Sequence, residues 1–154
     1  MTTRTVYLIS ARNTSFQRAH FSIFVPSASN PDQGTKIHAV GAPMAGYILE
    51  FKRNYNPSLE IHDQMFPIGQ VSSFDIIDSP NAAPSIPTPG ISNNFMAPVN
   101  DTNNKRCQEW TMEYVRYLVA KDLIGEEAIR IVESKRDPPT HGIGLRAVIG
   151  SRAI

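Results

Sequence analysis

The chain has 154 residues, of which 41% are apolar and 19% are charged, and its formal net charge is +1. This length and composition are typical of one folded globular domain with its own hydrophobic core, so residues 1–154 are expected to form a single domain. The near-zero net charge excludes a nucleic-acid partner held by bulk electrostatics.

Cys107 is the only cysteine, so an internal disulfide is impossible and the fold does not depend on an oxidising compartment. The apolar run VYLI near the N-terminus is too short for a secretory signal. No stretch approaches the roughly 20 apolar residues that a membrane span needs. The sequence therefore predicts a cytoplasmic protein without an integral membrane segment.

The first half of the chain is rich in β-branched and aromatic residues, in short segments that end at turn-forming residues. These segments follow one another with short connections, which favours an antiparallel sheet of about five strands. The strands are predicted at residues 4–11, 19–28, 35–43 and 45–55, with one or two short ones within 64–77.

The second half of the chain begins with a proline-rich segment, residues 78–104, which is expected to form a long loop. Helical spacing of apolar residues then predicts a helix over 104–124, with Asn103 or Asn104 as its N-cap. A shorter helix is predicted over 125–137. The tail beyond it is expected to add a last strand or a packed extension. The predicted class is α+β, with two or three helices against the sheet.

Cys107 falls in the first turn of the predicted helix. Unpaired backbone N–H groups and the positive end of the helix dipole favour a thiolate there, and Lys105 and Arg106 act in the same direction. The same N–H groups could stabilise an oxyanion. A cysteine nucleophile also needs a general base, which is usually a histidine.

Two of the four histidines, His20 and His38, lie in neighbouring predicted strands, where a suitable register would place them on one side of the sheet. One could then serve as the base and the other as its orienting partner. His62 and His141 lie in polar, turn-like segments and are expected to be solvated. A lone strand histidine is more often structural, so the hypothesis depends on the combination with Cys107.

The segments HFSIFVP, GTKIHAVG and RCQEWT, in this order, resemble the circularly permuted papain fold of the NlpC-like superfamily. The pattern is most similar to the lecithin:retinol acyltransferase-like proteins and the H-Ras-like suppressor phospholipases. In this chain Phe21 stands where that family has tryptophan after the first histidine. Arg106 stands where the family has asparagine before the cysteine.

This resemblance implies that Cys107 is the nucleophile, His20 the general base and His38 the residue that orients it. The implied activity is a hydrolase or acyltransferase acting on an ester, amide or thioester through a Cys-linked acyl intermediate. The substrate would be a small molecule, a lipid or another acyl compound, and no cofactor is implied. Arg106 and Gln108 are further candidates for contacts with the substrate or its oxyanion.

Three alternatives remain open at this point. A zinc site made from the two histidines and the cysteine is conceivable, but no CxxC or HxxxH pair supports it, and no metal site is predicted. The chain could instead be a non-catalytic binding protein of the same fold, which the altered residues around Cys107 favour. It could also be a small-molecule isomerase or cyclase that uses the two histidines as acid and base.

Overall fold

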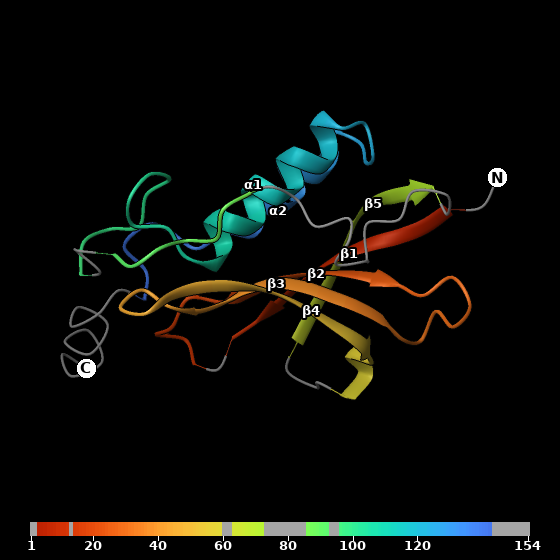
Figure 1. Ribbon diagram of the computed structural model, residues 1–154, viewed down its shortest axis with the longest axis horizontal. Coiled ribbons are helices and arrows are strands. Elements are labelled where there is room, and N and C mark those ends of the chain that lie inside the picture. The colour runs from red at the N-terminus through yellow and green to blue at the C-terminus, as the bar shows by residue number, and fades with distance from the viewer. Residues whose placement is uncertain (1–2, 13, 60–62, 73–85, 93–95, 143–154) are drawn as a thin grey trace.

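The computed structural model is an α+β fold in which one antiparallel sheet carries two helices on the same face (Figure 1). It describes residues 3–12, 14–59, 63–72, 86–92 and 96–142. The five strands lie in the order β4-β3-β2-β1-β5, and every neighbouring pair is antiparallel. The elements are β1 (Thr3–Ala11), β2 (His20–Pro26), β3 (Gly34–Ala42), β4 (Gly46–Tyr55), a 3-10 turn η1 (Pro57–Leu59), β5 (Asp63–Ser72), α1 (Cys107–Ala120) and α2 (Glu127–Lys135).

These elements confirm the predicted α+β class and the antiparallel sheet of five strands. The expected interruption at Pro67 and Gly69 is instead a register shift within the single strand β5. Val6 pairs with Gly69 and Tyr7 with Pro67, which leaves one extra residue between them. A bulge of this kind accommodates a proline that cannot donate to the ladder. The predicted C-terminal extension, the end of the 64–77 segment and His62 lie outside the described residues.

The core lies between the helices and the sheet. On β2 the alternate residues Phe21, Ile23 and Val25 are fully buried in the cluster that contains Trp110 and Leu118 of α1. Because successive strand residues point to opposite faces of the sheet, His20, Ser22 and Phe24 belong to the face away from the helices. Phe24 accordingly packs in a second, smaller cluster with Ile9 and Tyr55. The sheet thus has one face covered by helices and another built largely from its own side chains.

Helix α1 begins at Cys107, and its N-cap is Arg106 rather than Asn103 or Asn104. The prediction of an asparagine cap was wrong because Asn104 is used elsewhere. Its side chain donates to the carbonyls of Ala97 and Pro98 and accepts a hydrogen bond from Ser92. Asn104 therefore fixes the loop that precedes the helix.

The described part of the proline-rich segment lies against the turn between β3 and β4. The Tyr47 N–H donates to the Pro89 carbonyl at 2.9 Å, and the Ser92 N–H donates to the Pro43 carbonyl at 2.8 Å. Gly46 in this turn has a φ of 83°, a conformation that glycine adopts without steric cost. The chain is thereby guided along the β3–β4 turn toward the start of α1, where Cys107 lies.

Candidate functional site

Cys107 lies at the first residue of α1, and its thiol contacts the first residues of β2. The sulfur is 3.8 Å from the Ala19 carbonyl, and the backbone of Phe21 hydrogen-bonds it. These two residues flank His20 in the chain. The paired residues of β2 and β3 run only from Ile23 to Pro26, so the contact lies beyond the end of that ladder.

The thiol is buried, and burial raises its pKa from 9.0 to about 11, although the N–H groups of Phe21 and Gln108 act in the opposite direction. The sequence predicted a thiolate at this helix start. Desolvation outweighs the helix-terminal N–H groups here, because a charged sulfur would lose its hydration. The resting form of Cys107 at neutral pH is therefore the thiol.

His20 and His38 lie side by side across the gap between β2 and β3. Nε2 of His20 is 2.7 Å from Nδ1 of His38, and the rings meet edge to face with centroids 4.9 Å apart. Nε2 of His38 is in turn 2.7 Å from Oε1 of Glu50 on β4. We call these three residues the histidine relay.

The surroundings of both histidines in the relay favour the neutral imidazole. Burial, followed by the nearby His38 and Lys36, lowers the pKa of His20 from 6.5 to about 4. Burial also lowers the pKa of His38, although its hydrogen bond to Glu50 opposes that change. At neutral pH both rings therefore carry a single N–H.

The structure brings the two predicted histidines into direct contact and places Cys107 against the backbone on either side of His20. Within the described part of the chain, His20 makes no hydrogen bond to the thiol. Its ring uses Nε2 for the contact with His38. The predicted residues thus form one neighbourhood, in which the contact between sulfur and imidazole is not made in this conformation.

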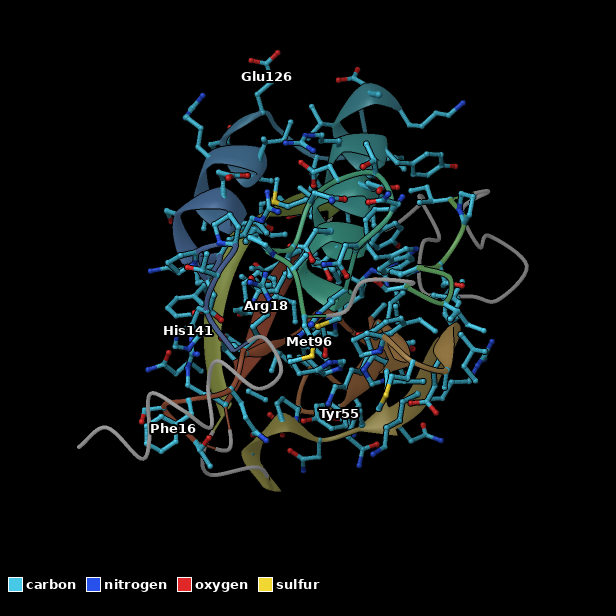
Figure 2. The ribbon with its side chains drawn as sticks, turned by 90° about the vertical axis from the view of Figure 1, so that its left-hand side faces the viewer. Phe16, Arg18, Tyr55, Met96, Glu126 and His141 are labelled. Atoms are coloured by element: carbon cyan, nitrogen blue, oxygen red, sulfur yellow. The ribbon has the colours of Figure 1, made fainter. Side chains whose placement is uncertain are left out.

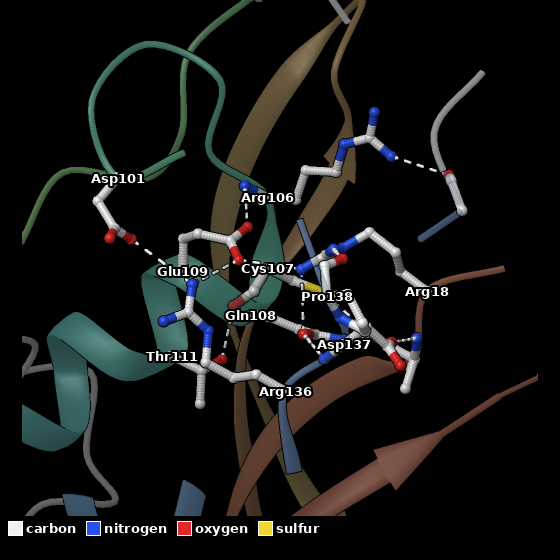
Figure 3. Close-up of polar contacts among 12 residues, drawn as sticks. Arg18, Asp101, Arg106, Cys107, Gln108, Glu109, Thr111, Arg136, Asp137 and Pro138 are labelled. Atoms are coloured by element: carbon white, nitrogen blue, oxygen red, sulfur yellow. Dashed lines mark hydrogen bonds and ion pairs between the residues drawn. The ribbon is translucent and has the colours of Figure 1, made fainter. Parts of the chain in front are cut away.

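A second polar group surrounds the start of α1 (Figure 3). Glu109 is fully buried, and its Oε2 accepts hydrogen bonds from Arg18 and Arg136, each at 3.0 Å. Its Oε1 accepts the Arg106 backbone N–H at 2.9 Å, which satisfies one unpaired donor of the helix start. The Arg18 side chain, labelled in Figure 2, is only 6% exposed. We define the buried charge cluster as Arg18, Gln108, Glu109, Arg136 and Asp137.

Gln108 uses its whole side chain within this cluster. Its amide nitrogen donates to the Ala19 carbonyl and to Asp137, and its amide oxygen accepts from Arg18 and from the Asp137 N–H. Burial alone would raise the pKa of Asp137, but hydrogen bonds from Arg12, Ala19 and Gln108 lower it instead. The side chain of Gln108 holds the helix start and its backbone N–H contacts the Cys107 sulfur, so the side chain is not available as a substrate contact.

Arg106, the other candidate substrate contact, is half-buried and lies near the thiol. Its guanidinium donates to the Gly142 carbonyl at 3.3 Å. Burial lowers the pKa of Arg106, and the negative charges of Tyr47, Glu109 and Cys107 in their ionised forms oppose this. Tyr47, at the start of β4, lies near the same charged residues. Burial, followed by the charge of Cys107, raises the pKa of Tyr47 to about 12. Tyr47 therefore enters the site as a neutral hydroxyl.

A cavity of about 1060 Å³ lies away from these residues, against β1, the end of β2 and η1. Its floor includes Tyr7, Phe24 and Met65. Among the described residues no group of three or more His, Cys, Asp or Glu side chains could hold a metal ion. In the same part of the chain, neither helix is long and apolar enough to cross a membrane.

A family model described as a family of unknown function (DUF6540) matches residues 6–125. The chain belongs to the DUF6540 family. The matched region contains the histidine relay, Cys107 and the whole of α1. No curated protein and no solved structure matches the chain. The function of this DUF6540 chain must therefore be argued from its own geometry.

Sequence reasoning missed two residues of the site in this DUF6540 chain. Glu50 pairs with His38 in the β3–β4 ladder, and Tyr47 pairs with Gly41. The position of Glu50 could have been found by assuming that the turn between the strands closes with Ala42 opposite Gly46. Tyr47 carried no such signal, because its relation to Cys107 depends on where α1 docks.

Proposed function

We propose that the chain is a cysteine-dependent acyl-transfer enzyme with a circularly permuted papain-like arrangement. The substrate would be an ester, amide or thioester of a small molecule or lipid, and the site would need no cofactor. A lone reduced cysteine as nucleophile suits the cytoplasm. The observation that carries the proposal is the docking of the Cys107 thiol on the strand segment that bears His20, whose ring is tied to a second histidine.

In the proposed reaction the sulfur of Cys107 attacks the acyl carbonyl carbon while its proton passes to the ring of His20. The tetrahedral oxyanion would be stabilised by backbone N–H groups of the first turn of α1. Collapse breaks the bond to the leaving group, which takes the proton from His20, and a thioester on Cys107 remains. Water or another acceptor then attacks the thioester, gives its proton to His20, and the thiol is regenerated.

The neutral thiol and neutral imidazole define the kind of catalysis. A thiolate–imidazolium pair would require a low thiol pKa, whereas here burial raises it. His20 must therefore act as a general base during the attack, in the way a histidine activates a serine hydroxyl. His20 belongs to the sheet face opposite the helices, whereas Cys107 docks from the helix side, so the attack would require the start of β2 to rearrange and turn the ring toward the thiol.

The test is acylation of the protein by activated esters and thioesters of increasing chain length, followed by mass spectrometry of the intact chain. We expect one acyl group on Cys107, with none on Cys107→Ala and a strongly slowed reaction in His20→Ala. His141→Ala is the matched control, because His141 is part of neither the relay nor the thiol site.

A second candidate function, a binding protein of the same fold without hydrolysis, is favoured by the burial of the thiol. It predicts that no member of the panel acylates Cys107. Equal acylation of the wild type and of His20→Ala would also count against the proposed catalysis, because the thiol would then react without a base.

A further inference from the structure

We propose that Glu50 is a positioning residue that sets the proton positions along the histidine relay and leaves Nδ1 of His20 as the basic atom. This inference rests on the proposed function for its catalytic meaning, but the proton positions themselves follow from the hydrogen bonds. The two links, from His20 to His38 and from His38 to Glu50, are both 2.7 Å long.

The argument begins at the carboxylate. An ionised glutamate can only accept hydrogen bonds, so Nε2 of His38 must carry the proton in its link to Glu50. A neutral imidazole has one N–H, which makes Nδ1 of His38 an acceptor. Nε2 of His20 must then be the donor in the link between the rings. The remaining nitrogen of His20, Nδ1, keeps its lone pair.

The reverse arrangement is unfavourable. If Nδ1 of His38 donated to His20, a neutral His38 would turn the lone pair of Nε2 toward the carboxylate of Glu50. Two acceptors would then face each other at 2.7 Å without a proton between them. Protonation of His38 would relieve this conflict, but burial disfavours the charged ring.

The surroundings of the relay reinforce this order. Lys36 and Lys52 lie directly opposite each other in the β3–β4 ladder, two positions along from His38 and Glu50 and therefore on the same face. Both ammonium groups lie over the ring of Tyr55, at 4.6 and 5.5 Å. The positive charge of Lys36 lowers the pKa of both rings, and that of Lys52 lowers the pKa of His38, which opposes an additional proton on either ring.

Glu50 also has access to solvent, since its side chain is 47% exposed, whereas the His38 side chain is 7% exposed. The relay therefore runs from water at β4 to a half-buried imidazole at β2. At its β2 end no described hydrogen bond reaches Nδ1 of His20, whose flanking peptide groups contact the thiol of Cys107. Glu50 acts through His38 and does not touch the reacting atoms.

The test is the tautomeric state of the two rings, measured by proton–nitrogen correlation NMR on protein labelled with nitrogen-15 at histidine. At pH 7.5 we expect both His20 and His38 to carry the proton on Nε2. His20→Gln and His38→Gln assign the signals. A wild-type spectrum in which His20 carries its proton on Nδ1 would overturn the inference, whatever the reaction of the protein.

Variants of Glu50 sharpen the test. Glu50→Leu removes the acceptor and is expected to give a mixture of tautomers at both rings, whereas Glu50→Gln keeps an acceptor oxygen and should preserve most of the wild-type state. Glu126→Gln, which removes a remote exposed carboxylate (Figure 2), should change nothing. Unchanged tautomers in a folded Glu50→Leu would overturn the role of Glu50.

The catalytic consequence is measured separately from the NMR result. With an ester that acylates Cys107, Glu50→Leu should slow acylation about 10- to 100-fold, the usual cost of removing a partner that orients a histidine. The substrate concentration for half-maximal rate should not change. The expected tautomers without any acylation would leave the inference about Glu50 intact and contradict the proposed function alone.

Discussion

Two polar groups lie close to the first residues of β2, and they differ in how completely their hydrogen bonds are used. In the buried charge cluster Glu109 receives two guanidinium groups and a backbone N–H, and both ends of the Gln108 amide are engaged. In the histidine relay the chain of hydrogen bonds stops at the ring of His20. The first group is closed around Glu109 and Gln108, although the buried Nε of Arg18 has no partner among the described residues. In the second group no described hydrogen bond reaches Nδ1 of His20.

This difference separates a structural role from a chemical one. A closed network of buried charges holds its elements in one arrangement, because moving any member leaves a charge without its partner. The cluster thereby fixes the start of α1, and with it Cys107, against β2. A network that ends in an imidazole lone pair can instead accept a proton and release it, which is the role proposed for His20. Under the proposed function, the cluster would position the nucleophile and the relay would supply the base.

The largest effect on stability is expected for Glu109→Ala. This change leaves the guanidinium groups of Arg18 and Arg136 without their shared carboxylate, and breaking a buried ion pair costs about 3–5 kcal/mol. Urea unfolding, followed by the fluorescence of the single tryptophan, Trp110, measures the loss. Glu50→Ala is the matched comparison in the other group, and because Glu50 is partly exposed its cost should be at most ~1 kcal/mol.

Equal losses in the two variants would contradict the division into a closed cluster and an open relay. Glu109→Gln adds a control for size, because it keeps the volume and one acceptor but removes the charge. It should fall closer to Glu109→Ala than to the wild type, since two buried cations would share a neutral partner.

A smaller effect is expected in the pH dependence of stability. The pKa of His20 is about 4 in the folded chain and 6.5 in the unfolded one. Between these two values His20 binds a proton in the unfolded chain but not in the folded chain. The contribution of His20 to stability is complete above pH 6.5 and is lost as the pH falls toward 4. The slope is at most ~1.4 kcal/mol per pH unit.

His20→Gln should lower this slope between pH 6.5 and 5, and unfolding free energies of the two proteins across that range measure the difference. The slope that remains in the variant comes from His38 and the carboxylates. An unchanged slope in His20→Gln would mean that His20 is not held neutral by the fold.

The sequence predicted the fold class, the sheet of five antiparallel strands and the meeting of His20 with His38. These follow from local patterns, because alternation and turn residues set strands, and a hairpin register sets which side chains share a face. Extending the pairing of Ile23 with Ile37 places Ser22 opposite His38, so that His20 is its diagonal neighbour on the same face. The register of the β2–β3 pairing could not be predicted from the sequence and is seen only in the structure.

The state of the thiol could not be predicted in the same way. The position of Cys107 at a helix start was visible in the sequence, but its burial results from the docking of α1 on β2 through Gln108 and Glu109. In the sequence Gln108 was predicted to contact the substrate or its oxyanion, and no partner was predicted for Glu109. Their actual partners, Arg18 and Asp137, are 91 and 29 residues away from them. Contacts of this range leave no local pattern in the sequence.

The central claim is that His20 removes the proton from a neutral Cys107 thiol, and the pH dependence of single-turnover acylation tests it most directly. With a thiol pKa of about 11 and a His20 pKa of about 4, the rate in the wild type should be nearly constant from pH 6 to 9. In His20→Ala the rate should be lower and rise about tenfold per pH unit, following the thiolate. A wild-type rate that rises tenfold per pH unit and is unaffected by the loss of His20 would contradict the account.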